Sequence, residues 1–240
     1  MKRLQLILLI MLSALLGCAS TKPAPKGQLV YCSYACTGSA GLGKDYCELI
    51  ADVDSVPKVI VVLGEGNRFE DPVIRGEYPV TREVVDSLCK ELEERKVYKL
   101  AGYNLNEAIT GGHSYRIYME YSSGEKVNAF WYGHGVKKEA LSAYHFIESF
   151  FAPWRERALI DDTITRVQQM ELRFDRLSNA QKSGTRYEEM QADYEALDWY
   201  MRSGQWKKDF EMDEKGRLPK DLKRGVLSED GLYEVLSQEL

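Results

Sequence analysis

Three groups of residues have the types and spacing that chemistry requires: a glycine-rich loop, four of the five cysteines, and the three histidines. The loop from Gly38 to Lys44 has the Gly-x-x-x-x-Gly-Lys spacing of a phosphate-binding loop, whose backbone amides cradle phosphate oxygens. That motif needs Ser or Thr after the lysine to hold Mg²⁺, but Asp45 follows here and would place a negative charge near the phosphate. We therefore expect neither a nucleotide nor a cofactor at this loop.

Cysteine thiols form disulfides in oxidising compartments and bind zinc where two close pairs occur. Cys32, Cys36 and Cys47 are neighbours in sequence, whereas Cys89 falls on the apolar side of a predicted helix and is typical of a small buried hydrophobic residue. We favour one disulfide among the first three, with free thiols as the alternative. The Cys-x-x-x-Cys spacing is loose and no second close pair follows it, so no metal site is predicted.

The histidines are His113, His134 and His145, and no two of them have the i, i+4 spacing of metal ligands on a helix. The first precedes a predicted strand, the second follows the partner of that strand, and the third lies on the next predicted helix. We interpret them as isolated surface or half-buried residues. The alternative is a hydrolase in which His113 or His134 acts as the base.

Aromatic side chains concentrate on one predicted β-hairpin. Residues 114–121 and 126–132 alternate in polarity on either side of a Ser-Ser-Gly-Glu turn, which is typical of paired strands. The alternation places Tyr118, Phe130 and Tyr132 on the face that packs away from the helices. Because aromatic residues are favoured at interfaces, we predict a recognition surface for a protein or a glycan there, with simple cross-strand packing as the alternative.

The elements around this hairpin predict an α+β domain over residues 29–152. Residues 57–63 form a β-branched apolar run bounded by glycines, as in a buried strand. A helical pattern begins after Thr81, and a second covers residues 137–151. This order indicates a small antiparallel or mixed sheet with helices on one face. We place the domain end near Pro153, because proline tends to terminate a helix.

Residues 153–240 are predicted to be all helical. Apolar residues recur at spacings of three and four from Ile160 to Leu177 and again from Tyr187 to Met201. Thr185 and Glu188 have the spacing of a capping box at the second start, so the two helices should form an antiparallel hairpin. Ser228 has the position and type of an N-cap for a short final helix.

The stretch from about residue 160 to residue 238 resembles a bacterial helical family catalogued as domain of unknown function 4298. The likeness rests on the run Ser203–Phe210 and on the run Asp213–Asp230, whose Gly-Val-Leu-Ser-Glu-Asp ending is its most specific part. It covers about a third of the chain. The resemblance implies an all-helical module and brings no activity, cofactor or catalytic residue.

The first eighteen residues have the pattern of a secretion signal. Lys2 and Arg3 precede an apolar run, Leu4–Leu16, that is too short to span a bilayer comfortably. The Leu-Leu-Gly-Cys sequence ending at Cys18 resembles the lipobox of bacterial lipoproteins. That resemblance implies removal of residues 1–17, followed by attachment of lipid to the thiol and the new amino end of Cys18. A plain cleaved signal or an uncleaved anchor is the alternative.

A lipid on Cys18 makes this residue an anchor, because two or three acyl chains hold a protein on a bilayer. Residues 18–28 then form the lipidated cysteine and a tether, since the segment is small, polar and punctuated by proline. Ala19 follows the cysteine in place of the Asp that often retains lipoproteins at the inner membrane. The resemblance therefore implies the outer membrane, with the inner membrane as the alternative.

Composition and charge limit the remaining function classes. The chain is 44% hydrophobic, which is enough to fold, and its formal charge of −5 offers little attraction for nucleic acid. We expect a membrane-anchored envelope protein that binds or scaffolds an envelope protein or a glycan, with no cofactor besides the covalent lipid. The alternative is an envelope hydrolase with a histidine-based site in the α+β domain.

Overall fold

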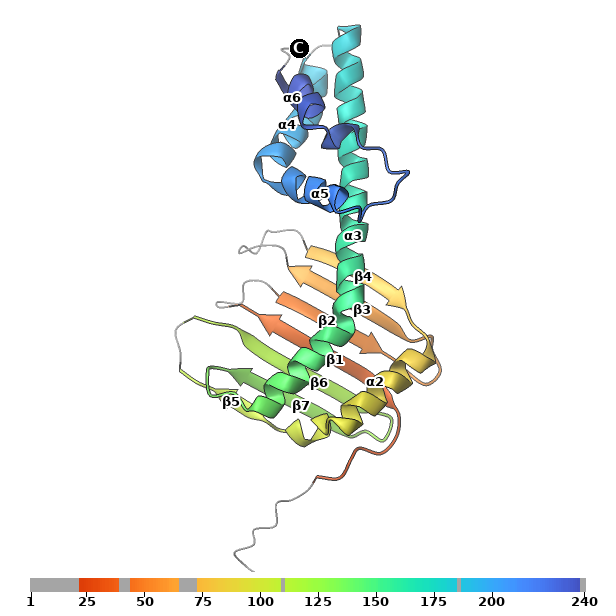
Figure 1. Cartoon of the computed structure of the whole chain (residues 1–240), viewed down its shortest axis with the longest axis vertical. Coiled ribbons are helices and arrows are strands. Elements are labelled where there is room, and N and C mark those ends of the chain that lie inside the picture. Colours follow the sequence, from red (N-terminus) through yellow and green to blue (C-terminus); the bar gives the residue numbers. More distant parts are fainter. Residues whose placement is uncertain (1–21, 39–43, 65–72, 109–110, 185–186, 238–240) are drawn as a thin grey trace, which may run out of the picture. The chain divides into compact units, whose positions relative to one another are not determined.

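The structure is a computed structural model that describes residues 22–38, 44–64, 73–108, 111–184 and 187–237. It divides into two compact units (Figure 1). Residues 1–73 and 77–151 form the first, called the sheet unit, and residues 74–76 and 152–240 form the second, called the helical unit. The predicted signal and Cys18 lie outside the described residues.

Seven strands form one mixed sheet in the order β4-β3-β2-β1-β6-β7-β5 (Figure 1). Strand β1 is central and antiparallel to both β2 and β6, whereas β5 runs parallel to β7. The strands are β1 (Leu29–Thr37), β2 (Lys44–Ile50), β3 (Lys58–Gly64), β4 (Val73–Pro79), β5 (Asn104–Asn106), β6 (Ser114–Tyr121) and β7 (Lys126–Tyr132). The predicted hairpin is β6 and β7, and the predicted buried strand is β3.

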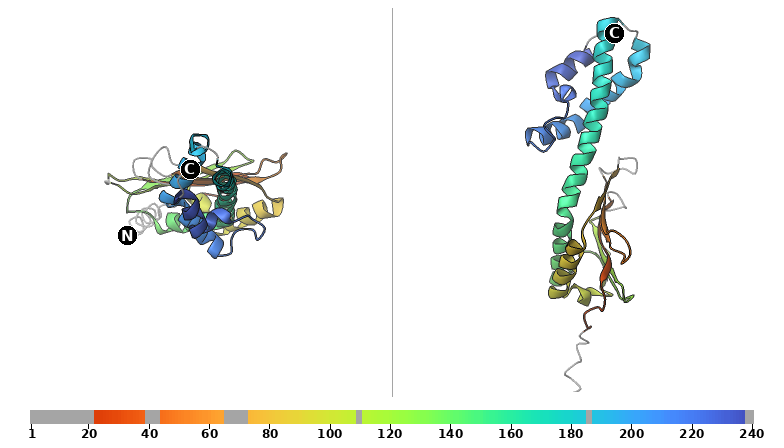
Figure 2. Two further views of the ribbon diagram at one scale, coloured as in Figure 1. Left: turned by 90° about the horizontal axis from the view of Figure 1, so that it is seen from above. Right: turned by 90° about the vertical axis from the view of Figure 1, so that its right-hand side faces the viewer.

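Helices cover one face of this sheet. Helix α2 (Arg82–Glu94), the short 3-10 helix η2 (Val97–Leu100) and the first turns of α3 lie together on that side (Figure 2). Helix α2 begins after Thr81, as predicted, and buries a stripe of Val85, Leu88 and Leu92. Because successive side chains of a strand point to opposite faces, every second residue of the central strands packs under the helices. The predicted α+β fold with helices on one face is therefore confirmed.

Helix α3 (Lys138–Ser183) continues across the boundary between the units, contributing residues 138–151 to the first and 152–183 to the second. It passes through Pro153, so the prediction that this proline ends the helix is wrong. Proline removes a single hydrogen bond to the carbonyl four residues earlier. Phe151 and Ala158 are buried on either side, and this packing offsets the lost bond.

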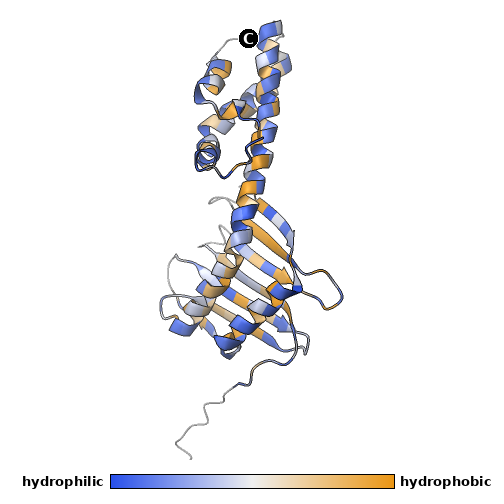
Figure 3. Cartoon of the chain, turned by 45° about the vertical axis from the view of Figure 1, so that its right-hand side comes forward, coloured by the Kyte–Doolittle hydropathy of each residue, from blue (hydrophilic) through white to orange (hydrophobic). Residues whose placement is uncertain are grey.

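The helical unit contains residues 152–183 of α3 with α4 (Tyr187–Arg202), α5 (Gln205–Glu214), the 3-10 helix η3 (Gly225–Leu227) and α6 (Glu229–Ser237). Hydrophobic and hydrophilic residues alternate along these helices (Figure 3). The apolar ones meet in a core that includes Val167, Leu177, Leu197, Tyr200, Val226 and Leu232. The predicted all-helical architecture of this part is therefore confirmed.

Two predicted caps of the helical unit have different outcomes. Ser228 is the N-cap of α6, as predicted. Its carbonyl accepts from the Leu232 N–H at 2.9 Å, and its hydroxyl accepts from the Gly231 N–H at 3.2 Å. Thr185, the predicted start of α4, lies outside the described residues. Within the described part of the chain, no helix is both long enough and apolar enough to cross a membrane.

Candidate recognition surface

The face of the sheet opposite α2 and α3 carries polar and aromatic side chains. In one ladder Ser33 of β1 lies opposite Tyr118 of β6, and in the next Ala35 lies opposite Arg116, which lies opposite Phe130 of β7. Neighbours opposite each other on a sheet have side chains on the same face. We call this side the aromatic face and define it by Tyr31, Ser33, Ala35, Tyr46, Glu48, Arg116, Tyr118 and Phe130.

A pocket of about 210 Å³ opens on the aromatic face over β1 and β2. Its lining includes the small side chains of Ser33 and Ala35 together with the larger Tyr31, Tyr46 and Glu48. Because Ser33 and Ala35 of the central strand are small, the larger side chains around them project further from the sheet and leave a hollow between them. The sequence of β1 therefore creates the pocket: its small residues point outward while Cys32 and Tyr34 are buried on the other side.

The pocket is polar at one wall and held in a fixed geometry. The Tyr31 hydroxyl donates to Oε2 of Glu48 at 2.5 Å. Burial and the bond to this carboxylate raise the pKa of Tyr31 to about 12, so the phenol stays protonated and keeps Glu48 in place. The Tyr118 ring meets the Tyr31 ring edge-on at 5.7 Å, and its hydroxyl donates to Glu120 at 3.1 Å. Preorganised aromatic and carboxylate groups of this kind are typical of binding sites.

The three residues predicted for recognition all lie on the uncovered side and are each half-buried. Tyr118 lies on β6 with its ring against Tyr31 of the pocket. The Arg116 guanidinium lies over the Phe130 ring, 5.8 Å from its centroid. The Tyr132 hydroxyl donates to the Gly111 carbonyl at 2.9 Å, so this ring is tied to the loop before β6. The structure thus brings Tyr118 and Phe130 to the aromatic face and leaves Tyr132 at its margin.

Sequence reasoning missed Tyr31 of the central strand β1 and also Tyr46 and Glu48 of the neighbouring strand β2. The signal that could have found them is the alternation Tyr-Cys-Ser-Tyr-Ala-Cys over residues 31–36. Read with period two, it separates a buried set from a second set that shares a face with the predicted hairpin aromatics. The run lacks the β-branched residues that usually mark a central strand, and so the pattern gave no strand prediction.

None of the four described cysteines takes part in a disulfide, so the favoured bridge among Cys32, Cys36 and Cys47 is absent from the structure. The strand register gives the reason. Cys47 lies opposite Tyr34, which places Cys32 and Cys36 on its two diagonals. Diagonal neighbours are about 7–8 Å apart, beyond the usual Cα separation of a disulfide. Burial raises the pKa of the Cys32 thiol to about 12.

The histidines have separate partners. Nδ1 of His113 lies 3.7 Å from Sγ of Cys36, and Nδ1 of His145 lies 3.6 Å from Oε2 of Glu148 on the exposed side of α3. His134 engages Glu107 only through its backbone N–H, at 2.5 Å. No group of three or more His, Cys, Asp or Glu side chains in the described ranges is arranged to hold a metal ion.

The end of the glycine-rich loop that the structure describes, at Lys44, does not have the form of a phosphate-binding loop. Lys44 begins strand β2, whereas a phosphate-binding loop leads into the N-terminus of a helix. The Asp45 carboxylate accepts from the Gly64 N–H at 3.1 Å and so joins β2 to the end of β3. Residues 39–43 lie outside the described part.

A protein-family model, Domain of unknown function (DUF4298), matches residues 167–239. The match supports the resemblance predicted for the C-terminal part. No curated protein matches the chain. The specific Gly-Val-Leu-Ser motif within this match has a packing role: the Val226 N–H donates to the Glu171 carboxylate at 2.6 Å, and Val226 and Leu227 are buried. These residues hold η3 against α3, and none of them lines a pocket described in this structure.

Proposed function

We propose that this chain is a lipid-anchored protein of the cell envelope whose sheet unit binds a protein or glycan partner through the aromatic face. The signal-like start and the Leu-Leu-Gly-Cys sequence at Cys18 support the anchor and favour the outer membrane. The observation that carries the binding role is the pocket of about 210 Å³ with its aromatic and carboxylate lining.

The chemistry of the aromatic face fits a partner that offers both apolar surface and hydroxyl or amide groups. Tyrosine and phenylalanine rings provide rigid apolar area at little cost in conformational entropy. The Glu48 carboxylate on β2 accepts hydrogen bonds, and Arg116 on β6, beyond the central strand, donates them. A sugar ring and a tyrosine- or asparagine-rich protein loop both have this combination.

The anchor is tested by the mass of the chain isolated from its native membrane. We expect a species that begins at Cys18 and carries diacylglycerol and an acyl chain on that residue. A Cys18→Ser variant should leave the membrane fraction, and the matched Cys36→Ser variant should stay in it. A native chain with an unmodified Cys18 would contradict the anchor.

The binding face is tested by a photoreactive residue introduced at Ser33 and irradiated in the native envelope. We expect one dominant crosslinked product, protein or glycan, and we expect it to disappear in the Ala35→Leu and Tyr46→Ala variants. The same photoreactive residue at Trp199, which is 59% exposed in the helical unit, is the control and should not yield this product. Equal crosslinking from both positions would exclude the aromatic face as the specific surface.

One observation favours the hydrolase alternative. Cys36 and His113 are 3.7 Å apart, and a thiol beside an imidazole is the arrangement of an activated cysteine nucleophile. Neither Cys36 nor His113 lines the pocket on the aromatic face, and for this reason we favour the binding role over hydrolysis. Hydrolysis of an activated ester by the wild-type chain, lost in both Cys36→Ser and His113→Ala, would reverse that order.

A further inference from the structure

We propose that a basic cluster at one end of the sheet unit, formed by Arg95, Lys96, Lys99 and Lys138, binds the anionic headgroups of the membrane to which the chain is anchored. This inference rests on the proposed function, because it requires the lipid on Cys18 to bring the cluster to a membrane. It adds the class of lipid and the orientation of the sheet unit on the bilayer.

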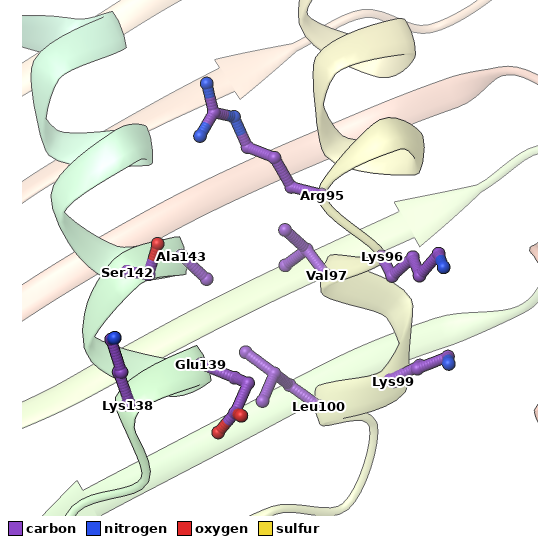
Figure 4. Close-up of a pocket in the computed structure, with 9 residues that line it drawn as sticks. All are labelled: Arg95, Lys96, Val97, Lys99, Leu100, Lys138, Glu139, Ser142 and Ala143. Atoms are coloured by element: carbon purple, nitrogen blue, oxygen red, sulfur yellow. The ribbon is translucent and has the colours of Figure 1, made fainter.

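The cluster surrounds a pocket of about 610 Å³ between the end of α2, the 3-10 helix η2 and the first turn of α3. Val97, Leu100 and Ala143 give it an apolar side. In Figure 4 the Arg95 side chain extends toward α3, while Lys96 and Lys99 extend from η2 on the side away from α3. The basic surface therefore continues from the pocket onto the outside of η2.

The charges of this cluster are largely free to meet an external anion. Lys96, Lys99 and Lys138 are exposed and have no ion pair with any described residue. The Arg95 guanidinium forms an ion pair with the Glu91 carboxylate at 3.2 Å and lies 4.2 Å from the centroid of the Phe146 ring. Glu139 is the one acidic residue of the pocket lining, and Glu91 beside the lining pairs with Arg95, so the three lysines carry the unpaired positive charge of the cluster.

The path of the chain before β1 places the anchor beside this cluster. The Lys22 ammonium donates to the carbonyl of Ala101, the residue that directly follows η2. Further along, the Lys26 N–H donates to Glu125 at 2.5 Å and the Gln28 N–H to Ser122 at 2.9 Å. Residues 22–28 and η2 consequently lie at the same end of the sheet unit (Figure 1).

Chain length then fixes how far the membrane is from the cluster. Four peptide bonds separate Cys18 from Lys22, and this stretch of chain spans at most about 14 Å when fully extended. The potential of an anionic bilayer acts over a Debye length of about 10 Å at moderate salt. A lipid on Cys18 therefore keeps η2 near enough to the bilayer for its lysines to reach that range, and Lys22 and Lys26 add to the positive charge there.

The lipid surface explains the geometry better than a soluble phosphate. A site for a small anion encloses it between converging donors, whereas Lys96 and Lys99 diverge from the pocket and stay exposed. Divergent lysines next to an anchor are the arrangement by which a polybasic segment meets many headgroups at once.

The test measures lysine acetylation on the full, lipidated chain, inserted into vesicles of phosphatidylcholine alone or of phosphatidylcholine with phosphatidylglycerol. We expect Lys96, Lys99 and Lys138 to be acetylated several-fold more slowly on the anionic vesicles. Lys207 and Lys208, exposed in the helical unit, serve as internal references and should react equally on both. Equal rates at the cluster on the two kinds of vesicle would overturn the proposal.

Matched variants and a soluble anion separate the remaining outcomes. Lys96→Glu with Lys99→Glu should abolish the protection of Lys138, and Lys207→Glu with Lys208→Glu, which has the same change in charge, should keep it. Protection by inorganic phosphate alone, on phosphatidylcholine vesicles, would assign the site to a soluble phosphate and overturn the lipid proposal. Loss of the anchor is a distinct result, because the chain would then separate from phosphatidylcholine vesicles altogether.

Discussion

The Arg166 guanidinium binds the buried carboxylate of Asp209 in a bidentate manner, with Nε donating to Oδ2 at 2.9 Å and Nη2 to Oδ1 at 2.7 Å. Asp209 has no exposed surface, and it also accepts from the Tyr200 hydroxyl at 2.8 Å and from the Gln205 amide at 3.2 Å. These bonds join α3, α4 and α5 through one side chain. A buried charge held by several partners makes the packing of the three helices interdependent.

Removal of this carboxylate should destabilise the helical unit strongly. Asp209→Ala leaves the partly buried Arg166 without its main partner, which typically costs about 3–5 kcal/mol. The control is Asp198→Ala, which removes an ion pair to Arg202 at 2.7 Å on an exposed surface and should cost less than about 1 kcal/mol. Urea unfolding followed by circular dichroism measures both, and equal losses in the two variants would show that burial of the pair does not matter.

The fold could be predicted where local pattern and tertiary packing agree. The hairpin at residues 114–132 alternates strictly, and its two strands have their predicted bounds. The helix at residues 82–94 has its three buried apolar residues on one stripe and begins after Thr81, as predicted. Strand β1 was missed because its buried side chains are Cys32 and Tyr34, which are poor indicators of a central strand. Pro153 misled the prediction because the packing of its neighbours, invisible in a local pattern, keeps α3 continuous.

The candidate site was predictable only in part for the same reason. Tyr118 and Phe130 lie in the recognised hairpin, and their face followed from alternation. The pocket needs Ser33 and Ala35 beside Tyr46, and that neighbourhood depends on the pairing of β1 with both β2 and β6. The basic cluster joins residues more than forty positions apart, Lys96 and Lys138, through the packing of η2 near the start of α3. No local spacing reports such contacts.

Gly225 in the Gly-Val-Leu-Ser motif should be required for close packing against α3. A Cβ at this position would lie 2.7 Å from Oε1 of Glu171 and 3.2 Å from the Phe174 ring. Gly225→Ala should therefore displace Glu171 and weaken its bond to the Val226 N–H, for a loss of about 1–3 kcal/mol. The loss should shrink when the same change is made in a Glu171→Ala background, because the obstructing carboxylate is gone. Additive effects in this double-mutant cycle would contradict the clash.

Reactivity of the thiols should follow their burial. Cys36 is half-exposed, whereas Cys32 and Cys47 have no exposed surface. In the folded chain at neutral pH, iodoacetamide should modify Cys36 first and the two buried thiols more slowly by roughly 100-fold or more, since these react only after opening. Peptide mass spectrometry resolves the sites, and unfolding in urea should equalise the rates. Modification of Cys32 as fast as Cys36 in the native chain would contradict the buried register.

Alkaline pH should destabilise the sheet unit through Cys32 and Tyr31. Burial raises the pKa of Cys32 from 9.0 to about 12, and burial with the bond to Glu48 raises the pKa of Tyr31 from 10.0 to about 12. Between about pH 9 and 12 the unfolded chain therefore binds fewer protons than the folded one, and the free energy of unfolding falls as pH rises. Cys32, which is fully buried, contributes a slope of up to about 1.4 kcal/mol per pH unit within its window. The half-buried Tyr31 contributes a smaller slope, because solvent screens its charge. In urea titrations at a series of pH values, Cys32→Ala should flatten the decline from pH 9 upward, and Tyr31→Phe should flatten it only from pH 10 upward. A decline of unchanged steepness in both variants would show that neither group controls alkaline unfolding.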